Sequence, residues 1–315
     1  MNVADAKEKI DGYLLRSMQP LGCWSYKVGG GPSMEATAWC SFALSSRDEG
    51  VARTSGQYLI KIQNEDGGWS TAPDTGFSDW VSGPVLMALR QINKLQKSKA
   101  TDKVIKKALI HFADSRPAFY PVVGRLLLLI SKGPEGVSFP RGWPWDPECF
   151  HWVEPTSYHL FALKVPGLPE HEVFERIIKH ANKYILKRVC KGGGWNYGNR
   201  ETLGAYLTPF RVTTAEALLA LQDVESHPAI DQSLKHLLTY SKDDTSTLGL
   251  AWSIICLDAY KKEYERELSF LLARQKEDGS FTNNNVANAL SSIALSCAQG
   301  ANPLKFDKIS MKSGV

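Results

Sequence analysis

The sequence predicts an all-α fold in which outer and inner helices alternate and close into an (α/α)6-type toroid. Three observations support this. A glycine turn that ends on an aromatic residue recurs along the chain, amphipathic segments precede such turns, and far more apolar segments follow them. The turns recur at roughly 45 residues or multiples of it, which is typical of helix-pair arrays. No sustained alternation with the period of a strand is present.

The recurring turns are the clearest internal repeat. Each joins one or more glycines to a tryptophan or phenylalanine: Gln19 to Trp24, Gln63 to Trp69, Gly192 to Trp195 and Gln275 to Phe281. A unit that repeats along the chain in this way buries its apolar face against its neighbours. We therefore expect one domain over residues 1–302, followed by a loose tail over 303–315.

The segments around the turns predict two kinds of helix. Charges lie along one side of the segments that precede the turns, as expected of outer helices. Examples are 49–62, 170–188 and 260–274. The segments that follow the turns are apolar all round and must be buried among other helices. These inner helices are predicted at 34–44, 80–89, 117–129, 155–163, 212–221, 245–257 and 286–295, which gives six or seven rounds.

Composition excludes several classes of function. The chain has 37 basic and 33 acidic residues, a net charge of +4 that is too small and too scattered for a nucleic-acid groove. No apolar run approaches the ~20 residues that span a bilayer, and the first eight residues lack the apolar core of a signal peptide. The six cysteines are widely spaced and are expected to be reduced. The expected location is the cytoplasm.

Two connections are longer than the rest. Five prolines between Leu129 and Leu163 leave no room for an outer helix and predict a stiff aromatic loop over 142–152. A second long loop is expected over 196–210. Long ordered loops in compact domains are more often functional than short ones.

Polar residues gather where the predicted inner helices begin. In such a barrel the chain passes from each outer helix to the next inner helix at the same end. These residues are therefore expected to ring one mouth of the central cavity. Asp, Asn and Ser in these positions cap helices, which is one interpretation. The other is an acid site, because burial and a like-charged neighbour both raise the pKa of a carboxyl group. The candidate acids are Asp243, Asp244, Glu154 and Asp79, and Glu35 and Arg211 lie in the same ring.

Aromatic residues on or beside the predicted inner helices offer faces that stabilise cations. Core packing is the alternative for each of them. Together with Arg211, the candidate substrate-binding residues are Trp39, Trp80, Phe119, Tyr120, Trp152, Tyr158, Phe210 and Trp252.

Metal and cofactor chemistry has little support in the sequence. Cys149 and His151 lie two residues apart with Asp146 nearby, but no second pair completes a site. His159 is expected to be a packed core histidine. No Asp-Asp-x-x-Asp run, phosphate-binding glycine loop or Gly-x-Ser-x-Gly motif is present. We expect neither a metal nor a cofactor.

The turns at Gln63 to Trp69, Gln19 to Trp24 and Gln275 to Phe281 resemble the QW repeat of squalene-hopene cyclases and the wider terpenoid cyclase/protein prenyltransferase toroids. Segments 152–158 and 193–200 are similar to stretches of single-domain bacterial members described as squalene cyclase-like or prenyltransferase-like. The resemblance extends over about residues 5 to 300 and implies the toroid fold.

The resemblance also implies a metal-independent, class II cyclisation or isomerisation of an isoprenoid, begun by a protonated Asp in an Asp-x-Asp-Asp-Thr motif. The matching stretch here is 241–245, where Asp243 takes the place of the acid, Ser241 replaces the first Asp, and Lys242 is placed to lower the acid's pKa. The prenyltransferase zinc motif Asp-x-Cys is not matched, because Asp146 and Cys149 are separated by one residue too many.

Two main hypotheses follow from these features. In the first, the protein is an acid-type enzyme that cyclises, isomerises or hydrates an apolar, isoprenoid-type small molecule. In the second, it is a non-catalytic toroid that binds a hydrophobic small molecule or a protein segment. A glycan enzyme with two carboxylates is a third. A deep closed pocket with an isolated acid favours the enzyme, and a hole filled by side chains favours the binder. Neither a nucleic-acid partner nor a transmembrane segment is expected, and a peripheral membrane contact is left open.

Overall fold

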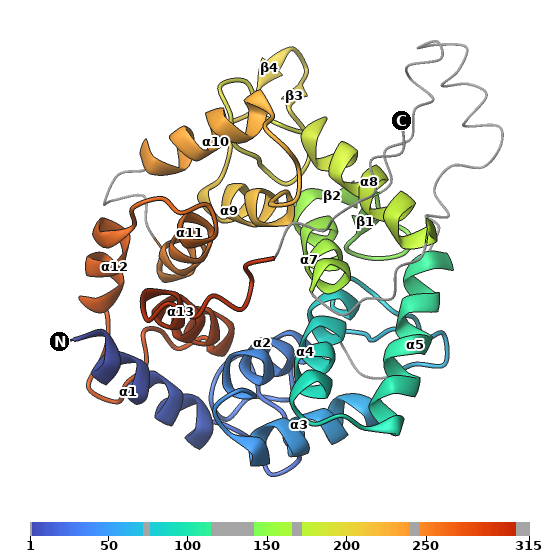
Figure 1. Cartoon of the computed structure of the whole chain (residues 1–315), viewed down its shortest axis with the longest axis vertical. Coiled ribbons are helices and arrows are strands. Elements are labelled where there is room, and N and C mark those ends of the chain that lie inside the picture. Colours follow the sequence, from blue (N-terminus) through green and yellow to red (C-terminus); the bar gives the residue numbers. More distant parts are fainter. Residues whose placement is uncertain (1, 72–75, 115–141, 166–171, 240–245, 307–315) are drawn as a thin grey trace.

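The computed structural model describes residues 2–71, 76–114, 142–165, 172–239 and 246–306. In these residues twelve helices form two concentric rings (Figure 1). The outer ring contains α1 (Val3–Arg16), α3 (Glu49–Lys61), α5 (Lys99–Asp114), α8 (Glu172–Leu186), α10 (Pro228–Thr239) and α12 (Glu265–Leu272). The inner ring contains α2 (Met34–Leu44), α4 (Ser82–Leu95), α7 (Val153–Lys164), α9 (Arg211–Ala220), α11 (Thr247–Ala259) and α13 (Asn285–Ala298).

The inner ring is closed. Each inner helix packs against the next one along the chain, and α13 packs against α2, so that the last inner helix meets the first (Figure 1). The predicted all-α toroid is therefore confirmed. The inner helix predicted at 117–129 lies outside the described residues. Since α4 packs directly against α7, the described inner ring has six members.

The burial of each helix follows its sequence pattern. In α2 every residue except Glu35 is buried, as a helix without a polar face requires. In α8 the buried residues lie on one side, among them Ile177, Ile178 and Ala181. The clearest boundary error concerns α12, which begins at Glu265 and not at residue 260. Lys261 adopts a left-handed backbone conformation, and the amide of Lys262 donates to the Leu257 carbonyl, which ends α11 in a turn.

Three turn tryptophans link an outer helix to the inner helix that follows it. The indole N–H of Trp24 donates to the Leu14 carbonyl at 2.8 Å, and that of Trp69 donates to the Leu59 carbonyl at 2.8 Å. Trp195 repeats the arrangement with Ile185 at 2.7 Å. The backbone amides of the same three tryptophans donate to hydroxyl groups on inner helices, namely those of Thr37, Ser82 and Thr214.

The last turn joins the two ends of the ring. The side-chain amide of Gln275 donates to the Ala6 carbonyl on α1 at 2.8 Å. Gly279 has a φ of +93°, and a Cβ atom there would lie 2.5 Å from the Lys9 carbonyl oxygen. Only glycine fits this approach. The carboxylate of Asp11 adds a buried link, because it bonds to Lys7 and Arg47 and also to Ser292 on α13.

Strands are few and short among the described residues. β1 (Trp143–Pro144) pairs with β2 (His151–Trp152), so the predicted stiff loop over 142–152 is a small hairpin. A second hairpin, β3 (Glu201–Thr202) with β4 (Ala205–Tyr206), lies in the second long loop. Among the described residues no helix has the length and apolar character needed to cross a bilayer.

The chain after α13 turns back into the barrel at the end where the inner helices finish. Leu304 is fully buried and Phe306 is nearly so. Gln222 holds this segment by donating to the Leu304 carbonyl at 2.8 Å, and Asn302 donates to Asp258 at 2.9 Å. The loose tail predicted from residue 303 is therefore wrong for 303–306, because apolar side chains there complete the core. Residues 307–315 lie outside the described residues.

Candidate functional site

Three glutamates lie near Tyr158 at the mouth of the barrel, the end where the inner helices begin. Glu35 lies in the first turn of α2, Glu154 lies in the first turn of α7, and Glu216 lies near the middle of α9. Glu216 is fully buried, whereas Glu35 and Glu154 keep part of their surface exposed. We call these three residues the carboxyl cluster.

The geometry at Tyr158 favours a proton on one carboxyl group. The Tyr158 oxygen lies 3.1 Å from Oε1 of Glu154 and 2.9 Å from Oε1 of Glu216. A phenol has one hydrogen, so it can fully donate in only one of these hydrogen bonds. The other contact is a full hydrogen bond when its carboxyl group is protonated and donates to the tyrosine oxygen. The arrangement is therefore suited to a neutral carboxylic acid at Glu154 or Glu216.

Burial explains why a neutral acid is stable here. Desolvation raises the pKa of Glu35 to about 7, although a 2.6 Å hydrogen bond from Tyr26 opposes the shift. Desolvation also raises the pKa of Glu154 to about 7 and that of Glu216 well above its ordinary value. Repulsion among the three carboxylates adds to the rise for Glu154 and Glu216.

Glu216 has one oxygen with no hydrogen-bond partner. Its Oε1 meets Tyr158, but its Oε2 is buried and has no partner among the described residues. Buried carboxyl oxygens in this state are rare and call for an explanation. A free oxygen on a neutral acid is the atom that can deliver a proton.

Aromatic rings pack around the cluster. Tyr158 lies 5.8 Å from Trp39, 6.3 Å from Trp252 and 5.7 Å from Trp80, measured between ring centroids. Trp39 and Trp252 are fully buried and meet edge to face at 5.3 Å. Their indole N–H groups have no acceptor among the described residues. Trp80 is partly exposed and also contacts Trp145.

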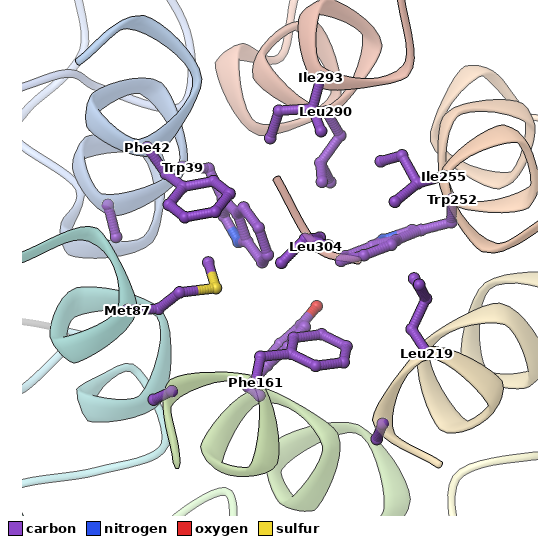
Figure 2. Close-up of a cluster of buried hydrophobic side chains, with 14 of the residues drawn as sticks. Trp39, Phe42, Met87, Phe161, Leu219, Trp252, Ile255, Leu290, Ile293 and Leu304 are labelled. Carbon is purple, nitrogen blue, oxygen red and sulfur yellow. The ribbon is translucent and has the colours of Figure 1, made fainter. Parts of the chain in front are cut away.

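Below this aromatic layer the barrel is filled by its own side chains. Figure 2 shows Trp39, Phe161 and Trp252 pointing into the central space from different inner helices, with Leu304 between them. The other labelled residues of this cluster are Phe42, Met87, Leu219, Ile255, Leu290 and Ile293. Of the acids at the mouth, Glu216 is fully buried, and Glu35 and Glu154 are partly exposed.

Asp79, one of the predicted acids, acts mainly as a structural acceptor. Its Oδ2 accepts from the amide and hydroxyl of Thr71, and its Oδ1 accepts from the amide of Val81. Burial raises its pKa and the bonds from Thr71 oppose the rise. Glu154, the other predicted acid in the described residues, belongs to the carboxyl cluster. Asp243 and Asp244 lie outside the described residues.

The predicted substrate-binding residues that the structure describes divide into three groups. Trp39, Tyr158, Trp80 and Trp252 surround the carboxyl cluster. Arg211 is buried between helices, where it donates to Ser253 at 2.8 Å and pairs with Glu267 at 3.2 Å. Trp152 and Phe210 lie at the helix starts of α7 and α9, and both contact the exposed ring of Tyr197. Phe119 and Tyr120 lie outside the described residues.

Sequence reasoning missed Glu216. The available signal was a carboxylate between Ala215 and Ala217 inside a segment that the sequence predicts to be a buried inner helix. A buried Glu in such a helix needs a partner or a role. Reasoning that looked for acids only in the first turns of inner helices passed over it.

The remaining candidates from the sequence are the packed histidine His159 and the possible metal ligand Cys149. His159 is buried and stacks on Trp143 at 4.6 Å, which confirms the prediction of a packed histidine. Cys149 is exposed. In the part of the chain that is described, no group of three or more His, Cys, Asp or Glu side chains is placed to hold a metal ion.

Comparison with known proteins supports the fold. No protein-family model and no curated protein sequence matches the chain. Solved structures do match. One is a variant of the type II terpene cyclase MstE from Scytonema in complex with geranylgeranyl dihydroxybenzoate, with a TM-score of 0.63, 14% identity and coverage of 96% of this chain and 97% of that one. The chain has a terpenoid cyclase-like fold.

Other structures with similar scores extend the range of chemistry on this terpenoid cyclase-like toroid. A protein from Actinoplanes matches with a TM-score of 0.63 and 17% identity, covering 95% of this chain and 100% of that one. An inactive variant of the α-1,6-mannanase of a Salegentibacter species, in complex with α-1,6-mannotriose, matches with a TM-score of 0.65 and 11% identity, covering 95% and 99%. The terpenoid cyclase-like fold therefore leaves the substrate to be argued from the site.

Proposed function

We propose that the protein is a general-acid enzyme that cyclises or isomerises an apolar, isoprenoid-type substrate at the mouth of the toroid, with Glu216 as the proton donor. The observation that carries the proposal is the fully buried Glu216, whose Oε1 meets Tyr158 and whose Oε2 has no partner among the described residues. A general acid has to be neutral at the working pH, and burial keeps the pKa of Glu216 high.

The chemistry begins with proton transfer to an alkene. The π electrons of the double bond form a C–H bond to the proton on Glu216, and the O–H bond electrons remain on the carboxylate. The positive charge appears on the other alkene carbon. The faces of Trp39, Trp252 and Trp80 stabilise this cation until a ring bond forms or a proton is lost. Loss of a proton from the product cation makes the whole reaction an isomerisation.

Tyr158 and Glu154 are placed to return a proton to Glu216. Glu154 is partly exposed to solvent, and its Oε1 lies 3.1 Å from the Tyr158 hydroxyl, which lies 2.9 Å from Glu216. A proton that enters at Glu154 can therefore reach Glu216 through one tyrosine. Under this proposal Glu216 replaces Asp243 as the acid, and Tyr158 and Glu154 are positioning residues.

The filled interior favours a short substrate. Because Trp39, Phe161 and Leu304 occupy the centre of the barrel, a substrate has to lie nearer the mouth than these side chains (Figure 2). A short prenyl chain suits this space better than squalene does. Exposed apolar side chains, such as Tyr26, Phe77, Tyr197 and Phe210, lie in the connections that lead into the inner helices. They support delivery of an apolar substrate from a membrane surface.

The test is turnover by matched variants. Purified protein is incubated with geranyl, farnesyl and geranylgeranyl compounds and with squalene, and products are detected by gas chromatography with mass spectrometry. Glu216→Gln is expected to lower turnover at least 100-fold, the lower end of what general acids contribute. Glu277→Gln, which removes an exposed carboxylate in the last turn, is expected to retain full activity. Asp243→Asn tests the acid that the family motif implies, and a loss confined to that variant would contradict the role of Glu216.

A carbohydrate substrate is the second candidate. It is favoured by two carboxyl groups that share one tyrosine hydroxyl and by exposed aromatic rings at the mouth. One structurally similar enzyme was solved in complex with α-1,6-mannotriose, so this sugar is a suitable test substrate for the chain. Release of mannose from α-1,6-mannotriose, lost in Glu216→Gln, would favour the glycan enzyme over the isoprenoid enzyme.

The filled interior favours the third candidate, a toroid that binds an apolar molecule and converts nothing.

A further inference from the structure

Among the described residues, the carboxyl cluster has no positively charged partner. The hydrogen-bonding partners of its side chains in this part of the chain are Tyr26 for Glu35 and Tyr158 for Glu154 and Glu216, and neither carries a positive charge. No salt bridge between described residues reaches any of the three glutamates. Arg211 lies on α9, as Glu216 does, but it is buried and pairs with Glu267 instead. Burying several acids without a counter-charge is costly unless protons or a bound cation neutralise them.

Elsewhere in the barrel the same chain does neutralise its buried charges. Lys164 is buried against Asp223, and Asp11 is buried against Lys7 and Arg47. Within the described part of the chain, the mouth therefore differs from the other sites of buried charge in having acids without a paired cation. The unpartnered Oε2 of Glu216 adds one acceptor that no described group uses.

The surroundings of the cluster select the kind of cation. Trp80 packs on Tyr158 with the ring planes tilted by 31° and the centroids 5.7 Å apart, and Trp39 and Trp252 also pack against Tyr158. Aromatic faces bind organic ammonium ions, whereas a small metal ion needs a shell of several oxygen atoms. We propose that the carboxyl cluster and its tryptophans form a binding site for an organic cation, a quaternary or protonated amine. This inference rests on the proposed function only because it uses the same site. An ammonium ion and a carbocation carry the same charge, so the side chains that stabilise one can also stabilise the other.

Several titratable groups face the site from the surrounding elements. The loop before α2 provides Tyr26, and the loop before α4 provides Asp79. Helix α2 contributes Glu35, α7 contributes Glu154 and Tyr158, and α9 contributes Glu216. Helix α11 presents Trp252, which does not titrate, and α13 begins with the uncharged Asn285. Near neutral pH the groups that change charge are Glu35 and Glu154, both with a pKa of about 7. Cation binding should therefore strengthen as the pH rises through 7.

The experiment compares choline with 3,3-dimethylbutan-1-ol, its uncharged isostere. Binding is measured by isothermal titration calorimetry and by tryptophan fluorescence at pH 5.5 and pH 8. We expect choline to bind at least tenfold more tightly than the alcohol at pH 8 and to lose most of that advantage at pH 5.5. Glu154→Gln is expected to weaken choline binding at pH 8 at least fivefold, with no effect on the alcohol. Glu277→Gln is the control for net charge.

Equal affinity for the two probes at both pH values would overturn the inference, as would displacement of choline by an equal concentration of Mg²⁺. The outcome is separate from that of the turnover assay. Choline binding without turnover of any prenyl compound would leave the cation site standing and remove the enzyme. Turnover of a prenyl compound without a preference for choline would support the enzyme and overturn the cation site.

Discussion

The two ends of the barrel treat buried charge in opposite ways. At the far end, where the inner helices finish, the ammonium group of Lys164 is completely buried and bonds to Asp223, to Asn182 and to a backbone carbonyl. At the mouth, three glutamates share two tyrosines and have no cation among the described residues. The far end pairs its buried Lys164 with Asp223, and the mouth keeps an excess of acid among the described residues.

This difference separates the part of the molecule that holds the ring together from the part that is free to bind. The apolar segment with Leu304 and Phe306 covers the far end and touches Phe161. Partly exposed acids and exposed rings occupy the mouth. Changes at the far end should mainly lower stability, and changes at the mouth should mainly alter binding and pH dependence.

The largest loss of stability is expected from Lys164→Met. The variant leaves the Asp223 carboxylate buried without its cation, and breaking a buried pair in this way costs about 3–5 kcal/mol. Urea unfolding followed by circular dichroism measures the loss. Removing both charges, as in Lys164→Met with Asp223→Leu, should recover much of it. Lys276→Met, at an exposed lysine, should change stability little, and an equal loss there would contradict the assignment.

The next largest loss is expected from Leu304→Ala. Leu304 is fully buried between inner helices, so truncation leaves a cavity and costs about 3 kcal/mol. Leu21→Ala serves as the control because Leu21 is 67% exposed. A stability unchanged by Leu304→Ala in thermal unfolding would show that the segment after α13 is not part of the core.

A smaller effect is expected in the pH dependence of stability. The pKa of Glu35 and Glu154 is about 7 in the folded protein and about 4.5 in the unfolded chain. The folded state thus holds protons that the unfolded state releases, and these groups make the protein less stable as the pH rises from about 4.5 to 7. A pKa unit corresponds to about 1.4 kcal/mol, and residual solvent contact reduces the effect, so we expect about 2 kcal/mol.

The measurement compares wild type with the double variant Glu35→Gln and Glu154→Gln at pH 5 and pH 7.5. Only the difference between the two proteins reports on the carboxyls. Burial lowers the pKa of His159 to about 3, so this histidine makes stability rise with pH over part of the same range. Parallel pH profiles for the two proteins would show that these carboxyls do not titrate near 7.

The smallest change in stability is expected from Glu216→Gln. Glutamine has the shape of the neutral acid and can still bond to Tyr158, so the free energy of unfolding at pH 5.5 should change by less than about 1 kcal/mol. The same variant is expected to abolish turnover. A large destabilisation at pH 5.5 would indicate that Glu216 is ionised in the folded protein.

The fold could be predicted from the sequence because its signals are local and repeated. A glycine turn that ends on Trp24 or Trp69 is made by the same hydrogen bonds each time, and an inner helix such as α2 is apolar all round. The site could be predicted only in part. Glu154 and Tyr158 were among the candidates, but Glu216 comes to them from another helix, and no local pattern shows that α9 and α7 bring these side chains together.

The place of Leu304 could not be predicted for a different reason. Two apolar residues among polar ones give no periodic signal, and their burial depends on a hole that exists only once six helices are in place. The loose tail was therefore the wrong expectation for 303–306.

The seam between α1 and α13 has a consequence for biosynthesis. Gln275 bonds to Ala6, and Ser292 bonds to Asp11, so residues from opposite ends of the sequence meet in the finished ring. A ribosome makes the first helix long before the helix that it packs against. During translation the face of α1 that packs against α13 stays uncovered, and the ring closes only after the last inner helix has emerged.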